Sequence, residues 1–229
     1  MNKMLIKPIA RIYNAYTSKF AIPRQSGISK SIKSEIVFEE DYRIEEAIRG
    51  IDGFSHLWLI WGFSQVPEGK WSPTVRPPKL GGNKRVGVFA TRSPFRPNGL
   101  GLSSVRLEEI KKSAQNGTYL VVNGADILNG TPIYDIKPYL PHADCKPDAT
   151  GGFSTDAAKY SLDVVIPTEL EEKIEENLRA PLRELLSQDP RPGYAEDGDR
   201  VYGFTYGRHE ISFTVADGTL TVCDVKNNK

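Results

Sequence analysis

Residues 54–63 read FSHLWLIWGF, a run of large apolar and aromatic side chains without Lys, Arg, Asp or Glu. Short runs of this kind between Gly, Pro, Asp and Ser clusters are typical of β-strands. Six more follow the same pattern on either side of it: residues 4–13, 35–39, 86–90, 103–110, 118–125 and 131–136. Parallel strands need long crossovers, and only residues 42–49 suggest a helix here, so an antiparallel barrel or curled sheet is expected.

The composition changes after Pro167. Thr168 and Glu171 form a capping-box pattern, and apolar residues then recur at helical spacing to Leu186, which predicts a helix interrupted or restarted at Pro181. Strands are expected at residues 201–206, 209–215 and 219–225, the last two joined in a hairpin through Asp217-Gly218. We therefore predict a mainly β N-terminal domain over residues 1–150 and a smaller α+β C-terminal domain over residues 151–229.

The composition of the 229-residue chain, with 39% hydrophobic and 26% charged residues, excludes a disordered or fibrous protein. Its net charge of +1 offers no whole-chain attraction for a polyanion. The sequence contains no apolar run near the roughly 20 residues of a membrane span, and no signal-peptide pattern. Cys145 and Cys223 lack metal-ligand spacing and are expected to be reduced, which favours a cytoplasmic protein.

A basic segment, residues 69–107, contains no Asp or Glu. Its cations are Lys70, Arg76, Lys79, Lys84, Arg85, Arg92, Arg96 and Arg106. Aromatic residues and prolines lie among them, a mixture suited to phosphate contacts and base stacking. A merely solvated basic loop is the alternative interpretation.

Three other features have an ordinary structural interpretation beside a functional one. Asp135 and Lys137 fall on the same face of an alternating strand. They are interpreted either as a surface ion pair or as a catalytic acid–base couple. Asn129-Gly130 is typical of a hairpin turn, and His56 of a core histidine. The sequence contains no HExxH, GxGxxG or P-loop motif, so neither a metal site nor a Rossmann cofactor site is expected.

Taken together, several segments in order resemble the TrmO family, also called TsaA-like or YaeB-like: KFAIPRQ (19–25), FSHLW (54–58), RPPKLGGN (76–83), VGVFATRSPFRPN (86–98), NGTPIYDIKPYLP (129–141) and QDPRP (188–192). The resemblance implies a single-sheeted antiparallel β-barrel, a homodimer, and S-adenosylmethionine-dependent methylation of N6 of threonylcarbamoyladenosine, next to the anticodon of threonine tRNA. Two positions depart from the family pattern, Gly99 for a usual proline and Asn129 for a usual aspartate.

The resemblance also implies where the cofactor binds. The cofactor-binding residues carried over by motif are Ser26, Gly27, Ile28, Ser64, Gln65, Arg92, Leu102, Asp126, Ile127, Leu128 and Asn129. Arg92 suits the cofactor carboxylate, and Asp126 or Asn129 suits its amino and hydroxyl donors. Asp135 is the candidate general base, with Lys137 and Tyr139 as orienting neighbours. Lys79, Lys84, Arg85 and Arg96 are the candidate RNA contacts.

Two other functions are compatible with these patterns. An RNA-binding module without catalysis would use the same basic segment and would not bind S-adenosylmethionine. A small-molecule methyltransferase would bind the cofactor and ignore tRNA.

Overall fold

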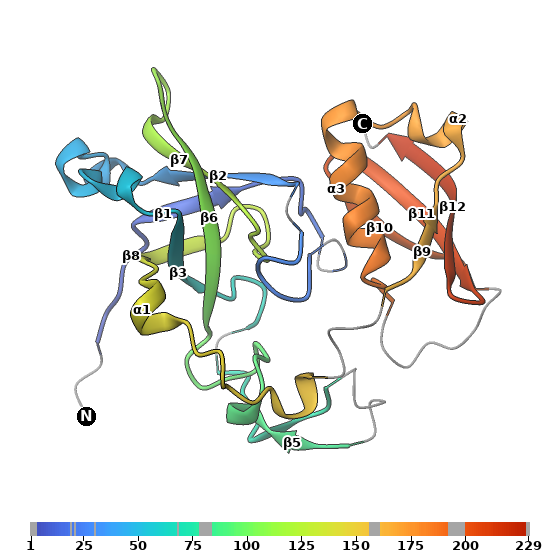
Figure 1. The fold of residues 1–229 in the computed structure, drawn as a ribbon, viewed down its shortest axis with the longest axis horizontal. Coiled ribbons are helices and arrows are strands. Elements are labelled where there is room, and N and C mark those ends of the chain that lie inside the picture. The colour runs from blue at the N-terminus through green and yellow to red at the C-terminus, as the bar shows by residue number, and fades with distance from the viewer. Residues whose placement is uncertain are drawn as a thin grey trace.

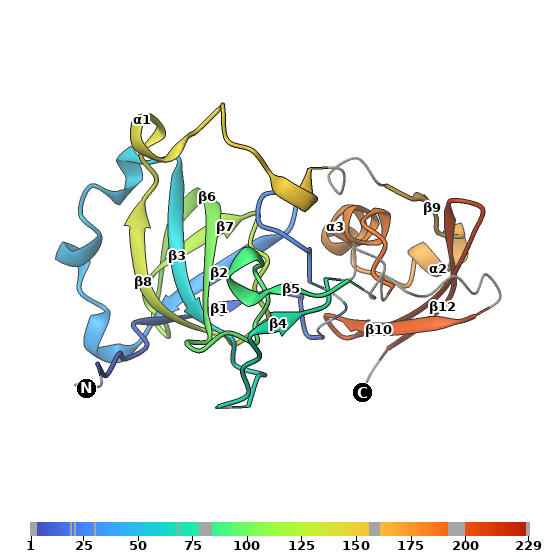
Figure 2. The same ribbon diagram turned by 90° about the horizontal axis from the view of Figure 1, so that it is seen from below.

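A computed structural model describes residues 4–18, 20, 22–29, 31–67, 69–77, 84–155, 161–191 and 200–227. The chain folds into a β-rich unit followed by a smaller unit, which stand side by side in both ribbon views (Figures 1 and 2). No helix among these residues is long and apolar enough to cross a membrane.

The first unit is built on six strands: β1 (Ala10–Tyr13), β2 (Lys33–Phe38), β3 (His56–Gly62), β6 (Leu100–Ser113), β7 (Gly117–Asn123) and β8 (Pro132–Pro138). They pair in the closed order β1-β2-β7-β6-β3-β8, and β8 returns to β1. Every pair in the ring is antiparallel. Closure leaves no strand of the ring with an unpaired edge, which protects it from pairing with other chains.

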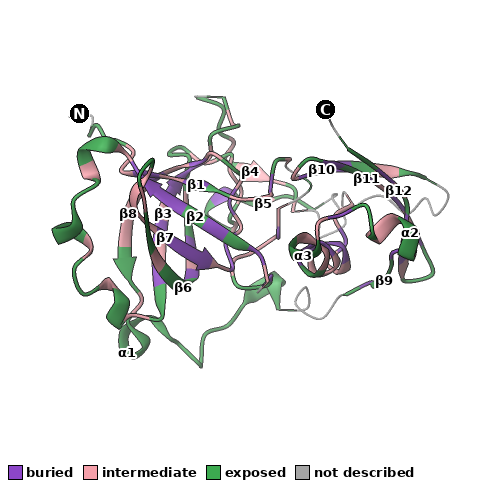
Figure 3. Cartoon of the chain, turned by 90° about the horizontal axis from the view of Figure 1, so that it is seen from above, coloured by how far each residue is buried: buried purple, intermediate pink, exposed green. Residues whose placement is uncertain are grey.

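Alternate residues along the strands pack in the interior of this ring, as the pleat requires, and Figure 3 shows buried residues on these strands. On β3 these are Leu57, Leu59 and Trp61. They pack in one core with inward residues of the other strands and with two residues of the segment between β7 and β8: Ala10, Ile12, Ile36, Phe38, Val105, Leu120, Val122 and Ile133 on the strands, and Ala125 and Ile127 between them. His56 begins β3 on the opposite face and is exposed, so its prediction as a core histidine was wrong.

Two local predictions for this unit were also wrong. Residues 42–49 form no α-helix; short 3-10 turns occupy this region at Glu40–Tyr42, Glu45–Ile48 and Ile51–Gly53. Asn129-Gly130 does form a turn, and Gly130 has a φ of 77°. The turn does not join a hairpin, because β7 pairs with β2 and β6 while β8 pairs with β1 and β3.

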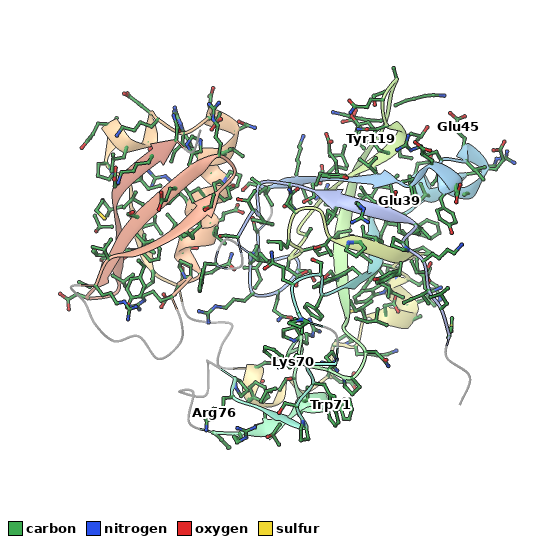
Figure 4. The ribbon with its side chains drawn as sticks, turned by 180° about the vertical axis from the view of Figure 1, so that it is seen from behind. Glu39, Glu45, Lys70, Trp71, Arg76 and Tyr119 are labelled. Carbon is green, nitrogen blue, oxygen red and sulfur yellow. The ribbon has the colours of Figure 1, made fainter. Side chains whose placement is uncertain are left out.

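The described residues 69–77 and 84–99 of the basic segment form an arm that projects from the first unit (Figure 1), whereas residues 100–107, with Arg106, belong to β6 of the barrel. The strands of the arm are β4 (Thr74–Val75) and β5 (Val86–Gly87), followed by a 3-10 turn at Val88–Ala90. Lys70, Trp71 and Arg76 lie on this arm, whereas Glu39 and Glu45 lie at the far end of the barrel (Figure 4). The structure therefore separates the arm in space from these two acidic residues.

The second unit contains β9 (Asp163–Val165), β10 (Tyr202–Tyr206), β11 (His209–Ala216) and β12 (Thr219–Asn227), together with α2 (Thr168–Glu171) and α3 (Glu176–Ser187). The strand order is β10-β11-β12-β9, with β9 parallel to β12 and the other pairs antiparallel. The β11–β12 hairpin turns at Asp217-Gly218 as predicted, both with positive φ. A short helix α1 (Pro141–Asp144) lies before this unit.

The helical region of this unit differs from prediction in one respect. The break falls between α2 and α3, and Pro181 lies inside α3 rather than at an interruption. Glu171 makes a bidentate pair with Arg183 at 2.9 Å on both oxygens, which ties α2 to α3. No side-chain cap forms at the start of α2, because Thr168 is already the first helical residue and the N-cap residue, Pro167, has no side-chain acceptor; the predicted capping box is therefore absent, and Glu171 pairs with Arg183 instead.

Residues from the first unit complete the core of the second. Tyr16 and Ile32 are buried among Leu182, Leu186 and the inward residues of the C-terminal sheet. Ser29 Oγ donates to Glu184 Oε2 of α3 at 2.8 Å. The two units therefore share a packed interface with apolar and hydrogen-bonded contacts.

Candidate functional site

The candidate site centres on Asp126, which follows β7 and is half-buried. Its Oδ1 accepts a hydrogen bond from Ser103 Oγ at 2.5 Å, and Ser103 Oγ accepts one from Trp61 Nε1 at 2.9 Å. Ser103 and Trp61 are buried on the inward faces of β6 and β3. The sheet thus fixes the direction of the Asp126 carboxylate through two consecutive hydrogen bonds.

Gly101 makes this arrangement possible. A Cβ at position 101 would lie 2.3 Å from Cε2 of the Trp61 ring, well inside van der Waals contact. The indole therefore packs on bare backbone, in the place that a side chain would fill.

Burial raises the pKa of Asp126, and this effect exceeds the opposing effects of the Ser103 hydrogen bond, the backbone of Asp126 itself, the charge of Arg92 and the backbone of Ser26. A carboxylate whose charge is incompletely compensated favours a cationic ligand. S-Adenosylmethionine carries an ammonium and a sulfonium, so the carboxylate fits this cofactor.

A loop of four consecutive residues, Arg24–Gly27, reaches the Asp126 carboxylate through the backbone of Ser26, and its side chains contact other segments. Gln25 Oε1 accepts a hydrogen bond from Arg92 Nη1 at 2.5 Å, and Ser26 Oγ accepts one from the backbone N–H of Ser104 at 3.3 Å. We call residues 24–27 the bridging loop.

The ends of the bridging loop are held as well. The N–H of Gly27 donates a hydrogen bond to the carbonyl of Gly124 at 2.8 Å. Gly27 itself has a φ of 78°, a backbone conformation that favours glycine. At the other end Arg24 Nη2 donates to the carbonyls of Asp189, at 2.6 Å, and Arg191, at 3.3 Å, in the second unit. The loop therefore connects the second unit to the candidate site.

The remaining cofactor candidates lie at varying distances from this centre. Ile28 and Leu102 are exposed, with Leu102 on the outer face of β6. Ser64 and Gln65 lie in an exposed turn after β3, anchored by the bond from Phe63 N–H to the Gly99 carbonyl. No hydrogen bond links this turn to Asp126 among the residues that the structure describes.

The segment after Asp126 turns back toward β1. Ile127 is buried in the barrel core, and its carbonyl accepts a hydrogen bond from Asn14 Nδ2 at 3.0 Å. Asn129 Oδ1 accepts one from the N–H of Asn14 at 2.9 Å. The half-buried Leu128 accepts a hydrogen bond at its carbonyl from the N–H of Thr131. These contacts fix the backbone that follows Asp126.

The catalytic candidates lie on the outer face of the sheet. Asp135 Oδ2 and Lys137 Nζ are 2.9 Å apart, so the ion-pair interpretation describes their resting state. Asp135 pairs across the sheet with Ile60, and Ile60 pairs with Leu102, which places Asp135 and Leu102 in one row across three strands. Tyr139 packs against Trp58 with ring centroids 5.5 Å apart.

The RNA candidates differ in their environments. Lys84 is exposed, and Lys79 lies outside the described residues. Arg85 donates to Thr74 Oγ1 at 2.7 Å, and Arg96 donates to the carbonyl of Thr91 at 2.8 Å, so both guanidiniums also hold their own loops. Phe89, Phe95 and Trp71 are exposed aromatic residues of the same segment.

Sequence reasoning missed four residues of the site: Trp61, Gly101, Ser103 and Gln25. Only Gln25 had a signal, as the last residue of KFAIPRQ. Ser103 and Gly101 appear in the sequence as ordinary members of a strand, and only the register of β3 with β6 brings them to Trp61. Within the described part of the chain no group of three or more His, Cys, Asp or Glu could hold a metal ion.

Known proteins that are similar to this chain match it over nearly its full length. Residues 11–145 match the family of the tRNA-methyltransferase O N-terminal domain, and residues 159–228 match the TrmO C-terminal domain. The tRNA (adenine(37)-N6)-methyltransferase of Escherichia coli K12 is 40% identical over 230 residues, 97% of each chain. A putative S-adenosylmethionine-dependent methyltransferase of Pseudomonas aeruginosa PAO1 is 40% identical over 206 residues, 86% of this chain and 87% of the relative.

A solved structure is similar as well. The crystal structure of TrmO from Pseudomonas aeruginosa superposes with a TM-score of 0.79 and 29% sequence identity, covering 99% of this chain and all of that one. The mainly β first unit and the smaller second unit predicted from sequence are both confirmed in outline.

Proposed function

The chain belongs to the TrmO family, and on that premise we propose that it transfers a methyl group from S-adenosylmethionine to N6 of the adenosine at position 37 of tRNA. The substrate nucleoside is threonylcarbamoyladenosine, in threonine tRNA. One observation carries the proposal: the bridging loop, Arg92 and Asp126 come together from three distant segments at a half-buried carboxylate.

In this proposal Asp126 binds the cationic part of the cofactor. The hydrogen bonds to Asp126 and the charge of Arg92 offset only part of the cost of burying its carboxylate. A cationic ligand group beside this carboxylate supplies further favourable electrostatic interaction. Arg92 is exposed and held by Gln25, in position for the cofactor carboxylate. The bridging loop, the turn at Ser64 and Gln65, and the backbone of residues 126–129 surround the rest of the ligand.

The cofactor supplies an electrophilic methyl group. The work of the protein is then to hold N6 of the substrate in line with that group and to exclude water, and positioning supplies most of the acceleration. N6 carries a carbamoyl substituent and is a weak nucleophile, so removal of its proton assists the attack. Asp135 accepts that proton in our proposal, while Lys137 and Tyr139 orient the carboxylate.

The basic arm binds the tRNA. Lys79, Lys84, Arg85 and Arg96 contact phosphates, and exposed aromatic rings nearby offer stacking surfaces for unpaired bases. Support comes from the concentration of positive charge on the arm, away from Glu39 and Glu45 (Figure 4).

Three further parts of the proposal concern the whole molecule. The barrel over residues 1–150 is the cofactor-binding domain, and residues 151–229 form a second domain. The protein acts as a homodimer, which agrees with the exposed apolar side chains of Leu100 and Leu102 on the outer face of β6. It works in the reducing cytoplasm, which agrees with two free cysteines.

The decisive experiment is mass spectrometry of tRNA nucleosides after incubation with protein and S-adenosylmethionine. We expect a mass gain of one methyl group on threonylcarbamoyladenosine, and no gain on tRNA that lacks the threonylcarbamoyl group. Calorimetric titration with the cofactor and gel shift with tRNA separate the alternatives. An RNA-binding module without catalysis would show no binding of S-adenosylmethionine in the calorimetric titration. A small-molecule methyltransferase would show no binding of tRNA in the gel shift.

A further inference from the structure

A cavity of about 240 Å³ lies at the junction of the N-terminal loop and the C-terminal sheet. Its lining residues are Phe20, Pro190, Arg191, Arg200, Val201, Tyr202, Gly203, Phe204 and Phe213. We call it the C-terminal pocket. None of its lining residues belongs to the cofactor site or to the basic arm described above.

The walls of the C-terminal pocket are aromatic. Tyr202 stacks on Phe213 with ring centroids 5.7 Å apart, and Phe204 meets Phe213 edge to face at 6.0 Å. Phe20 reaches the pocket from the first unit and remains half exposed, at 54% of its surface. Phe204 and Phe213 are buried in the core of the second unit, so the exposed ring at the pocket is that of Phe20, a stacking surface that the folded core does not use.

Two polar features point to a ligand that is itself both polar and anionic. The hydroxyl of Tyr202 is buried and has no hydrogen-bond partner within the described structure. Such a group is costly unless a ligand or water satisfies it. The Arg200 guanidinium lies 5.3 Å from the centre of the Tyr202 ring and is exposed to solvent, with no salt bridge to a described carboxylate.

The size of the pocket limits the ligand. Sites for drug-sized molecules usually measure about 300–1,000 Å³, so this cavity holds a single ring system. A planar ring with hydrogen-bonding edges, attached to an anion that remains outside, matches the aromatic walls, the tyrosine hydroxyl and the arginine at once. An unstacked nucleotide has this composition.

We propose that the C-terminal pocket binds one unpaired base of the tRNA substrate, stacked on Phe20 and hydrogen-bonded to Tyr202, with its phosphate at Arg200. This inference rests on the proposed function, because it takes the RNA as the substrate. It adds a contact site in the second unit, connected to the cofactor site by the bridging loop through Arg24.

The test measures the Kd for threonine tRNA by filter binding at several salt concentrations. Phe20→Ala is expected to raise Kd roughly 5- to 100-fold, the range for removal of one stacked base, without changing the salt dependence. Phe20→Trp restores binding because it keeps a stacking ring, whereas Phe20→Leu does not. Arg200→Ala is expected to weaken binding and to reduce the log-log salt slope by about 0.7.

Tyr202→Phe isolates the hydroxyl without disturbing the packing, because that hydroxyl makes no hydrogen bond in the described structure. We expect it to raise Kd roughly 2- to 10-fold. The matched charge control is Arg49→Ala, in the region of the 3-10 turn Glu45–Ile48 at the end of the barrel far from the second unit (Figure 1). This variant is expected to bind tRNA like the wild type.

The proposal is overturned if Phe20→Ala and Tyr202→Phe both bind tRNA within about twofold of the wild type, or if Arg49→Ala weakens binding as much as Arg200→Ala. Titration with S-adenosylmethionine, expected to be unchanged in every variant, verifies the fold. Failure of the proposed function looks different, because the wild type itself would then fail to bind or methylate tRNA.

Discussion

Ser103 Oγ lies 2.5 Å from Asp126 Oδ1, although 23 positions separate the two residues in sequence. The serine is inward on β6 and fully buried, and it also receives the indole N–H of Trp61. Its one proton is thereby committed to the carboxylate, since its oxygen already accepts from the tryptophan. The orientation of the Asp126 carboxylate is therefore set by side chains of β3 and β6 in the interior of the barrel, and not only by the loop in which Asp126 lies.

The glycine under Trp61 provides the sharpest test of this arrangement. Gly101→Ala forces the indole away, because the new Cβ would lie 2.3 Å from it. We expect a decrease of about 1–3 kcal/mol in folding stability and weaker cofactor binding. Gly99→Ala is the matched control, since a Cβ there meets nothing within 4 Å. Thermal melts and calorimetry compare the two, and equal effects would contradict this account.

Asp126→Asn should raise stability and reduce function together. Because the pKa of Asp126 is higher in the folded than in the unfolded chain, the wild type loses stability as pH rises from the unfolded pKa through the folded one. The asparagine variant escapes this loss, so its advantage is present at neutral pH and disappears in acid. A gain of about 1 kcal/mol would shift Tm by about 2–4 °C. An asparagine variant that melts at a lower temperature than the wild type at pH 7 would contradict the conclusion that burial raises the pKa of Asp126.

Arg92→Ala is expected to weaken S-adenosylmethionine binding by about 1.5–3 kcal/mol, because it removes a charge-assisted hydrogen bond to the cofactor carboxylate. Arg92→Lys keeps the charge and should recover part of the affinity, although a lysine cannot reproduce the guanidinium geometry. Isothermal titration provides the measurement, with Arg49→Ala as the control for an exposed arginine far from the site. Unchanged affinity in Arg92→Ala would remove this residue from the site.

The double variant Lys70→Ala/Lys84→Ala tests the arm as an RNA surface. Both lysines are exposed and form no salt bridge within the described residues, so their removal breaks no ion pair of the fold. We expect a higher KM for tRNA and a salt slope flatter by about 0.7 for each phosphate that the arm no longer binds, with unchanged cofactor affinity. Wild-type KM and slope would show that the arm is only a solvated loop.

Asp135→Asn should separate chemistry from binding. If Asp135 accepts the proton from N6, kcat falls about 100-fold or more while the affinities for cofactor and tRNA remain. Lys137→Met, which removes the other half of the same ion pair, is expected to have a smaller effect on kcat. Equal kcat for Asp135→Asn and the wild type would show that Asp135 is not the general base and only forms a surface ion pair with Lys137.

The sequence predicted the strands well because their apolar runs are long and bounded by turn residues. All six ring strands overlap a predicted run, and the Asp217-Gly218 hairpin forms as expected. The histidines show where local patterns fail. His56 lies in an apolar run and is exposed, whereas His209 lies in a plainer strand and is fully buried against Glu175. Which face of a strand turns inward depends on register, which a single strand does not encode.

The candidate site was predictable only in the parts that form motifs. Arg92, Asp126 and the bridging loop lie in segments with unusual composition. Ser103 and Gly101 act through a partner 40 or more positions away on β3, at Trp61, and nothing in their own neighbourhood marks them. The short strands β4 and β9 were missed for a related reason, because two or three residues leave no measurable periodicity.

The bridging loop has a thermodynamic consequence. Arg24 is held by the second unit, Gln25 by Arg92 and Gly27 by the backbone after β7, within about 11 Å of extended chain. A segment this short has no slack, so a shift of the second unit is transmitted to the residues around Asp126. We therefore expect occupation of one unit to alter the affinity of the other, and by linkage the change is reciprocal: cofactor and tRNA should each raise or lower the binding constant of the other by the same factor.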